Sequence, residues 1–192
     1  MASKKNPFVQ PSPLQKVLLL ELAGVAKRCY DRGWSWGTAG NFSIRGDEGV
    51  IWQSPTGLCK GDLKPDLFIP VDLESETSLE KFSMKPSAEM PVHAAIYKLD
   101  AKARCVVHTH PTESVALSLL TDEFKFSGEE MIKVLGKHSH LEELSIPIFS
   151  NLDPENMVKF SSTVDISTAM PSKLVFLKGH GVYAWGKTPL EA

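Results

Sequence analysis

The chain has 192 residues and a formal net charge of −2, with 42% hydrophobic and 23% charged residues. This length fits one domain, which buries roughly 70% of the surface that the unfolded chain exposes, and the composition excludes a wholly disordered protein. Because 23 acidic residues outnumber 21 basic ones, nucleic-acid binding driven by bulk charge is excluded. No apolar run approaches the roughly 18 residues of a membrane span.

The first predicted element is a helix that follows residues 1–11, which are expected to form a flexible tail. Ser12 can cap this helix, Pro13 suits its first position, and Gln15 can complete a capping box. A glycine in the left-handed conformation commonly follows the last helical turn, so Gly33 is expected to end the helix.

Residues 12–192 are expected to form one domain in which strands and helices alternate irregularly, and this order predicts the mixed α/β class. Strands are predicted at 42–45, 50–54, 67–73, 104–110, 124–126, 146–149, 174–178 and 182–185. Further helices are predicted at 87–99, 115–120, 129–135 and 153–169. A capping pattern at 188–191 starts one more helix, which the given sequence cuts short.

The three cysteines, Cys29, Cys59 and Cys105, are far apart in the sequence. An odd number of dispersed cysteines indicates neither a disulfide framework nor a thiolate metal site. Residues 1–12 also lack the apolar segment of a signal peptide. A reducing, cytoplasmic compartment is therefore expected.

The strongest local signal for chemistry is the pair His108 and His110 on a predicted strand. Residues two apart on a strand point to the same side, so both imidazoles can reach one metal ion. His180, between two glycines at the end of another apolar strand, can supply a third ligand. Three histidines around zinc leave one position open, which is typical of a catalytic site. The alternative is a pair of partly buried, hydrogen-bonded histidines.

Three other histidines are interpreted as structural or surface residues. His138 and His140 form a second alternating pair, but it lies near a helix end without strand character. His93 follows Glu89 by four residues on a predicted helix. A histidine with satisfied hydrogen bonds is the simpler interpretation of His93, and a supporting role behind a ligand is the alternative.

Three turn-rich segments can bind an anion through hydroxyl, amide and backbone N–H groups. Their candidate residues are Asn41, Thr56, Gly57 and Ser87, and Lys60 can add a positive charge. Two carboxylates, Glu89 and Glu130, are candidates for proton transfer. Glu89 also has a structural interpretation, because an acidic side chain stabilises the first turn of a helix.

Taken in order, these segments resemble the class II aldolase/adducin family from about residue 14 to the end. The matching segments are 37–43, 54–57, 85–89, 108–110 and 179–186. Within the family, segments 130–133, 146–149 and 180–186 are most similar to its dehydratases. The ordered set is far more specific than any one segment.

The resemblance implies a largely antiparallel central sheet flanked by helices, and a homotetramer with active sites near subunit contacts. It implies one zinc ion per subunit on His108, His110 and His180, and Glu130 as proton donor or acceptor. It also implies phosphate contacts from the residues of the turn-rich segments. Aldolases of this family place a metal-proximal glutamate where Glu89 stands, whereas animal dehydratases have a cysteine there, so the role of Glu89 stays open.

The function that the resemblance implies is zinc-dependent removal of water from a ketose phosphate. The alternatives are a sugar-phosphate aldolase or 4-epimerase with the same metal, and an adducin-like binding module without catalysis. A binding module has no need of the three metal-binding histidines, which this chain has. A small sugar phosphate is therefore the expected partner, rather than a nucleic acid or a membrane.

Overall fold

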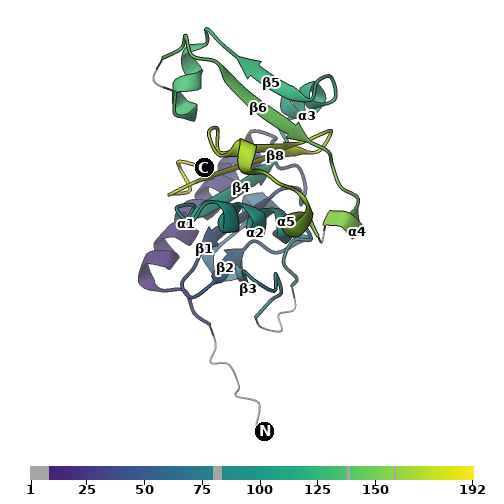
Figure 1. Cartoon of the computed structure of the whole chain (residues 1–192). Coiled ribbons are helices and arrows are strands. Elements are labelled where there is room, and N and C mark those ends of the chain that lie inside the picture. The colour runs from purple at the N-terminus through teal and green to yellow at the C-terminus, as the bar shows by residue number, and fades with distance from the viewer. Residues whose placement is uncertain (1–8, 80–83, 138, 158) are drawn as a thin grey trace.

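The computed structural model describes residues 9–79, 84–137, 139–157 and 159–192. An eight-stranded sheet forms its centre, in the order β3-β2-β1-β4-β8-β7-β6-β5 (Figure 1). Neighbouring strands are antiparallel except for β6 and β7, which are parallel. The strands are β1 (Asn41–Arg45), β2 (Val50–Gln53), β3 (Ile69–Asp72), β4 (Cys105–Thr109), β5 (Glu123–Phe126), β6 (Leu144–Phe149), β7 (Leu174–Leu177) and β8 (Gly181–Gly186). The expected mixed α/β fold with a mostly antiparallel sheet is confirmed.

The helices lie on both faces of this sheet. They are α1 (Pro13–Asp31), α2 (Met90–Leu99), α3 (Thr112–Ser118), α4 (Pro154–Met157) and α5 (Phe160–Thr163). Short 3₁₀ helices in the described part of the chain span Lys60–Asp62, Pro65–Leu67, Glu130–Leu135 and Ser167–Ala169. Among the described residues, no helix is both long and apolar enough to cross a membrane.

Helix α1 begins and ends where its capping residues predict. Ser12 accepts a hydrogen bond from the Gln15 backbone, and the Gln15 side chain accepts one from the Ser12 backbone, which completes the capping box. Gly33 follows the last turn with a φ of 73°, in the left-handed region that favours glycine.

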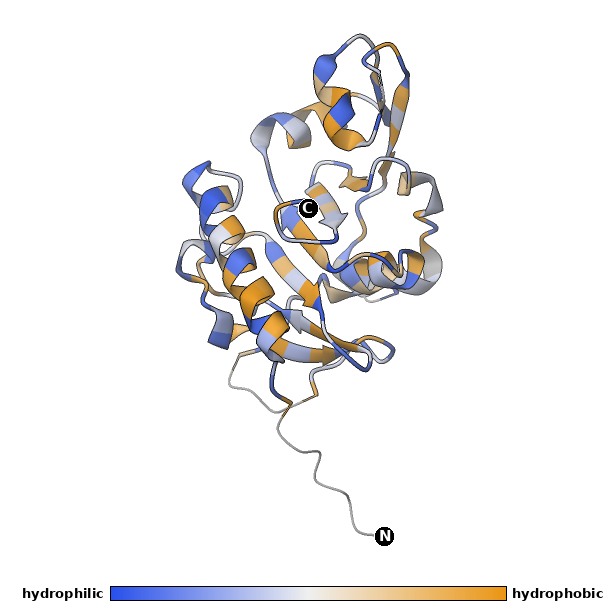
Figure 2. Cartoon of the chain, turned by 90° about the vertical axis from the view of Figure 1, so that its left-hand side faces the viewer, coloured by the Kyte–Doolittle hydropathy of each residue, from blue (hydrophilic) through white to orange (hydrophobic). Residues whose placement is uncertain are grey.

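Successive side chains of the central strands point to opposite faces of the sheet, and each face has its own hydrophobic core. Val107 points to the face covered by α1, where it joins Leu22 and Phe42. Val106 points to the opposite face, where it packs with Ile96 of α2 and Phe160 of α5. Figure 2 shows hydrophobic residues along the strands and mixed hydrophobic and hydrophilic residues on the helices beside them. The even-numbered side chains of β4, including His108, therefore face α2.

Helix α2 begins three residues later than the predicted helix at 87–99. Pro91 lies in its first turn, as it must, because proline lacks an N–H group and clashes with the carbonyl four residues earlier. Ser87 to Glu89 consequently form a loop before the helix, so Ser87 is not a helix N-terminus. Glu89 is the N-cap residue and points toward the sheet.

The predicted long helix at 153–169 is wrong. The chain forms α4, α5 and a 3₁₀ helix instead. Val164 adopts an extended conformation (φ −107°, ψ 117°) after α5, which suits a β-branched residue. The Asp165 carboxylate then accepts a hydrogen bond from the Ser167 backbone, and such local bonds compete with continued helix.

The hairpin of β5 and β6 extends away from the rest of the sheet, at the top of Figure 1. It has a small hydrophobic core of its own, in which Phe124 packs edge to face on Phe176 of β7 with ring centroids 4.9 Å apart. The predicted helix at 129–135 lies in the connection between β5 and β6 as a 3₁₀ helix, Glu130–Leu135.

Candidate metal and sugar-phosphate site

Three neighbouring strands carry a row of polar side chains on the face that α2 covers. Asn41 of β1 pairs with His108 of β4, and His108 pairs with Tyr183 of β8. The Tyr183 ring stacks on the His108 ring at a centroid distance of 3.9 Å. This register aligns an amide, an imidazole and a phenol across the sheet.

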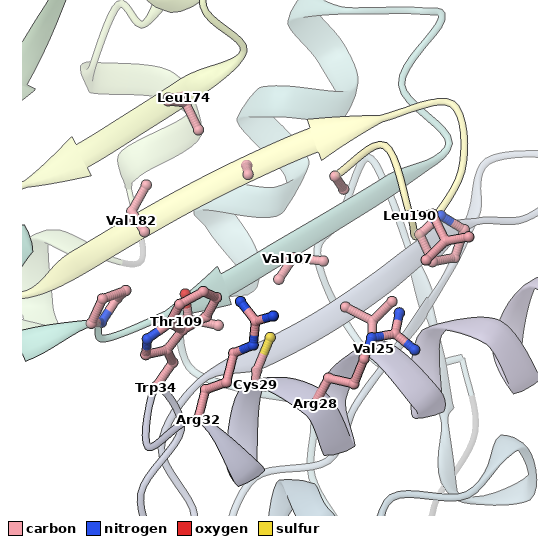
Figure 3. Close-up of a pocket in the computed structure, with 14 residues that line it drawn as sticks. Val25, Arg28, Cys29, Arg32, Trp34, Val107, Thr109, Leu174, Val182 and Leu190 are labelled. Atoms are coloured by element: carbon pink, nitrogen blue, oxygen red, sulfur yellow. The ribbon is translucent and has the colours of Figure 1, made fainter. Parts of the chain in front are cut away.

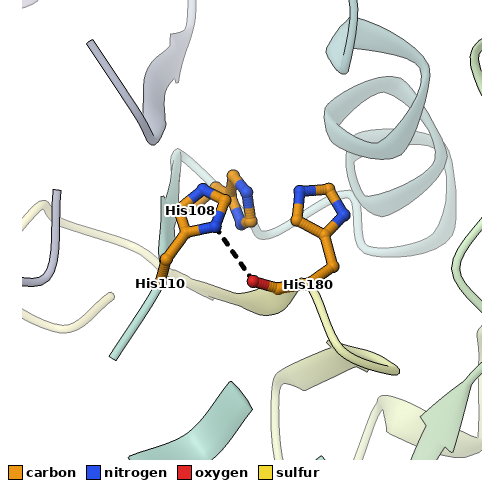
Figure 4. Close-up of side chains that lie close together, drawn as sticks. All are labelled: His108, His110 and His180. Atoms are coloured by element: carbon orange, nitrogen blue, oxygen red, sulfur yellow. Dashed lines mark hydrogen bonds between the residues drawn. The ribbon is translucent and has the colours of Figure 1, made fainter. Parts of the chain in front are cut away.

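The three predicted metal ligands come together at the end of this row (Figure 4). His108 and His110 lie at the end of β4, and His180 lies in the turn before β8. Ring nitrogens of the three lie within 4.8 Å of one another. The predicted cluster of His108, His110 and His180 is thus present in the fold, and it can hold a metal ion.

Each of the three imidazoles presents Nδ1 to an oxygen acceptor. The Nδ1 atoms lie 3.0 Å from Val182 O for His108, 2.9 Å from His180 O for His110 and 3.0 Å from Asn151 Oδ1 for His180. A nitrogen that faces such an oxygen carries a proton, so Nε2 is the nitrogen of each ring that can bind a metal ion. Metal-binding histidines commonly have this arrangement, in which one ring nitrogen is held and the other is available.

Glu89 joins the cluster through both carboxylate oxygens. Its Oε1 lies 2.9 Å from His180 Nε2, and its Oε2 lies 3.2 Å from His108 Nε2. The same Oε2 accepts hydrogen bonds from Asn41 Nδ2 at 2.5 Å and from Tyr183 Oη at 3.0 Å. Burial alone raises the pKa of Glu89, but the contacts with His180 and His108 and the bond from Asn41 together hold that pKa well below its usual range.

The donor set fits a divalent metal ion. Burial lowers the pKa of His108 well below its usual value, and burial together with His180 lowers that of His110, so these rings are neutral ligands. Within the described residues, the buried Nε2 of His108 makes no hydrogen bond. A lone pair on His180 Nε2 beside an ionised Glu89 oxygen is repulsive unless a cation or proton lies between them. Three imidazoles and one carboxylate are ligands that zinc accepts.

The predicted anion-binding residues surround a cavity of about 260 Å³ beside the histidines. An isolated bridge between Pro55 and Pro86 holds two of the turn-rich segments together. The cavity is lined by Asn41, Thr56, Lys60, Ser87, Glu89 and His110, among others. Gly57 does not line it in the described part of the chain, but it lies next to Thr56 with a φ of 73°.

Lys60 is fully buried beneath this cavity. Its ammonium donates hydrogen bonds to Thr38 O at 2.8 Å and Leu58 O at 2.7 Å. Burial lowers the pKa of Lys60 to about 8, because the charged form is poorly solvated there. A buried cation at the base of a polar cavity favours an anionic ligand.

A second cavity, of about 440 Å³, lies on the other side of Glu89 and His110. Both cavities share these two residues. The second one is also bordered by His180 and Asn151 and by the apolar side chains of Leu152 and Met157. The metal-binding cluster is therefore flanked by a polar cavity with a cation on one side and a more apolar cavity on the other.

Glu130 lies away from this cluster in the same chain. Its side chain is 68% exposed and contacts Lys133 at 2.5 Å and His140 at 3.3 Å. It borders neither cavity as far as the described residues extend. His140 is half-exposed, as its surface interpretation predicts, whereas His138 lies outside the described residues. Of the two candidate carboxylates, Glu89 lies beside the histidines of its own chain and Glu130 does not.

Sequence reasoning missed two residues that contact the cluster. Tyr183 stands out in the sequence only as part of the segment 179–186, although its place two residues after Gly181 on β8 puts it on the same face as the site. Asn151 holds His180 from the loop after β6, and nothing in its local sequence indicates this contact.

A cavity of about 390 Å³ lies on the opposite face of the sheet (Figure 3). It is bordered by Arg28 of α1, by Arg32 just after that helix, and by Val107 and Val182 of the central strands. Val107 and His108 are successive residues of β4, so their side chains point to opposite faces of the sheet and Val107 points away from the histidines. This cavity is therefore separate from the metal-binding cluster.

Comparison with known proteins identifies the family of this chain. Residues 20–192 match the class II aldolase and adducin N-terminal domain, and the chain belongs to the class II aldolase/adducin family. Methylthioribulose-1-phosphate dehydratase of Enterobacter sp. (strain 638) is 37% identical over 165 residues, which cover 84% of this chain and 79% of that protein. The protein of the same name from Komagataella phaffii is 34% identical over 176 residues, covering 88% and 72%. In structure, l-fuculose-1-phosphate aldolase of Thermus thermophilus superposes with a TM-score of 0.68 at 25% identity, covering 91% of this chain and 82% of that one.

Proposed function

We propose that this protein is a zinc-dependent dehydratase of methionine salvage. It converts 5-methylthioribulose 1-phosphate to 5-methylthio-2,3-dioxopentyl phosphate and water, with one zinc ion per subunit. The proposal is supported by the similarity to methylthioribulose-1-phosphate dehydratases at 34–37% identity. The unpaired state of Cys29, Cys59 and Cys105 favours a cytoplasmic location.

The observation that carries the proposal is the pair of cavities that meet at Glu89 and His110. The substrate has a phosphate at one end, a methylthio group at the other and oxygen atoms between them. In our proposal the phosphate occupies the polar cavity above Lys60, where Asn41, Thr56 and Ser87 line the cavity and contact it, and Gly57, next to Thr56, adds a contact from the edge of the cavity. The methylthio end then lies in the cavity bordered by Leu152 and Met157, and the C2 and C3 oxygens face the histidines.

His108, His110 and His180 would hold the zinc ion, and Glu89 beside them adds the negative charge that favours a divalent cation. Bound zinc supplies Lewis-acid polarisation of the substrate carbonyl, which makes the C3 proton easier to remove. The lone pair of each Nε2 is kept free for this purpose by the oxygen atom that holds Nδ1.

The reaction removes the C3 proton and the C4 hydroxyl, which leaves as water. The enol that remains gains a proton at C4 and loses the proton of its C3 hydroxyl, which gives the 2,3-diketone. We assign Glu130 to this proton transfer, as acceptor at C3 or as donor to the departing C4 hydroxyl. Glu130 lies outside the cluster of its own chain, so in this proposal the Glu130 that acts on the substrate belongs to a neighbouring subunit. A homotetramer with active sites at subunit contacts provides such a neighbour.

The second candidate is a sugar-phosphate aldolase or 4-epimerase. It is favoured by Glu89, which stands where the family's aldolases place a glutamate, and by the superposition on a fuculose-phosphate aldolase. A single assay separates the two functions. Purified protein is incubated with 5-methylthioribulose 1-phosphate, with and without a chelator, and the diketone and any aldehyde fragments are measured. We expect chelator-sensitive diketone formation, and aldehyde release in its place would contradict the dehydratase assignment.

A further inference from the structure

A line of buried polar side chains runs from Glu89 into the interior between α2 and the sheet. Asn41 contacts Glu89, and His93 Nε2 contacts Asn41 Oδ1. His93 Nδ1 lies 2.7 Å from Ser43 Oγ, and Ser43 Oγ lies 2.9 Å from Tyr97 Oη. The four residues beyond Glu89 are between 0% and 3% exposed, so water does not compete for these bonds.

The carboxylate fixes the direction of every bond in this line. Asn41 Nδ2–H donates to Glu89 Oε2, so the same amide faces His93 with its acceptor Oδ1. His93 must then donate through Nε2–H to that oxygen. Its Nδ1 is left as the acceptor of the Ser43 hydroxyl, and Ser43 Oγ in turn accepts from the Tyr97 hydroxyl. Each donor in the line points toward Glu89.

Burial lowers the pKa of His93 to about 3, so the ring is neutral and has one donor and one acceptor nitrogen. Both nitrogens have partners that suit the Nε2–H tautomer. The opposite tautomer would place two lone pairs between His93 Nε2 and Asn41 Oδ1, and the amide would have to rotate and present Oδ1 to the Glu89 carboxylate. Two acceptors in a buried site repel each other, which disfavours that alternative.

We propose that His93 is a positioning residue, whose neutral Nε2–H tautomer locks the Asn41 amide and thereby holds the Glu89 carboxylate against the metal-binding histidines. Ser43 and Tyr97 support His93 from behind. Asn41 also borders the polar cavity, so its amide connects the anion-binding side of the site to Glu89. The kinetic part of the test below rests on the proposed function, whereas the spectroscopic part does not.

The first experiment is ¹⁵N NMR of the histidine rings in the full-length protein. The His93 signals are assigned by their loss in His93→Gln. We expect Nε2 of His93 to be protonated and Nδ1 to be unprotonated at neutral pH, because both hydrogen-bond partners require it. A proton on Nδ1, or exchange between the two tautomers, would overturn the proposal whatever reaction the protein catalyses.

The second experiment compares His93→Leu with His93→Gln. Leucine removes the donor to Asn41, whereas the glutamine amide can replace the Nε2–H group. We expect His93→Leu to lower kcat about 10- to 100-fold, the range typical for residues that orient metal-site groups, with KM and zinc content near the wild-type values. His93→Gln should recover most of that loss. Unchanged kcat in a folded His93→Leu protein would contradict the positioning role.

Ser43→Ala provides a milder variant in case His93→Leu does not fold. It keeps His93 but removes the donor to Nδ1, so we expect a smaller fall in kcat and a changed Nδ1 signal. Ser172→Ala is the matched control, because Ser172 is also a buried serine with its own local hydrogen bonds, remote from the line. Equal effects of the two serine variants would reduce the line to a purely structural feature and refute the proposal. Absence of dehydratase activity in the wild type would instead count against the proposed function, and the NMR result would stand.

Discussion

Gly181 lies so close to Thr109 that no side chain fits between them. A Cβ atom on Gly181 would lie 2.5 Å from the Thr109 carbonyl oxygen and 2.9 Å from Cε1 of His108. Because both obstacles belong to the strand that carries the metal ligands, we predict that Gly181→Ala separates β8 from β4. Overpacking of this kind typically destabilises a protein by about 1–3 kcal/mol, and urea unfolding with zinc analysis should show lower stability and weaker metal binding.

Gly24→Ala is the control for that variant. Gly24 lies inside α1, where an added Cβ would meet Arg28 at an ordinary contact distance of 3.8 Å. Alanine is favoured over glycine in a helix by roughly 0.5–1 kcal/mol, so this variant should be slightly more stable than the wild type. A Gly181→Ala protein with wild-type zinc content and stability would contradict the tight β4–β8 contact.

Replacing a histidine of the cluster should remove metal and activity together. We predict that His110→Ala lowers the zinc content per subunit and abolishes turnover, because the remaining nitrogens no longer surround an ion. Elemental analysis of purified protein measures this directly. His140→Ala is the control for zinc content, since His140 lies outside the cluster. Equal zinc in both variants would mean that the ion binds elsewhere.

Subunit mixing tests the origin of Glu130. We predict that Glu130→Gln and His110→Ala are each inactive, and that refolding the two variants together restores part of the activity. In a mixed oligomer, one subunit supplies the histidines and its neighbour supplies the carboxylate. Glu130→Gln should keep a normal zinc content, because the residue does not contact the cluster of its own chain. If mixed oligomers form and remain inactive, Glu130 does not act across a subunit contact.

The buried ammonium of Lys60 should make stability depend on pH in the alkaline range. Its pKa falls from 10.5 to about 8 through burial. Between these values the unfolded chain holds a proton that the folded chain lacks, so the free energy of unfolding increases as the pH rises. We predict that the stability of the wild type relative to Lys60→Met increases from pH 8 to pH 10 in urea titrations. Parallel pH curves for the two proteins would contradict this.

The parts of the fold and of the site that the sequence predicts correctly depend on local rules. His108 and His110 share a face because strands alternate, and Ser12 caps α1 because its hydroxyl lies beside the first turn. Asn151 and Tyr183 depend on tertiary contacts across the sheet, which no local pattern encodes. The helix predicted at 153–169 is wrong for a different, local reason, because the Asp165 carboxylate accepts a hydrogen bond from the Ser167 backbone that competes with continued helix.

The position of Glu130 relative to the site is a further point that local sequence patterns do not predict. The role that we propose for Glu130 rests on resemblance, and the fold of one chain places it on a 3₁₀ helix that borders neither cavity of the site.

The place of β8 between β4 and β7 has a consequence for how the molecule is made. Among the strands that the structure describes, β8 comes last in the sequence, yet it occupies an interior position in the sheet and joins β1–β4 to β5–β7. During synthesis, the ribosome releases every other strand before β8 is available. Until then, the edges of β4 and β7 that β8 will join are unpaired. Pairing between strands that are far apart in the sequence, such as β4 and β8, is slow. A metal ion that binds His108, His110 and His180 together would therefore meet its full set of ligands only after β8 has joined β4.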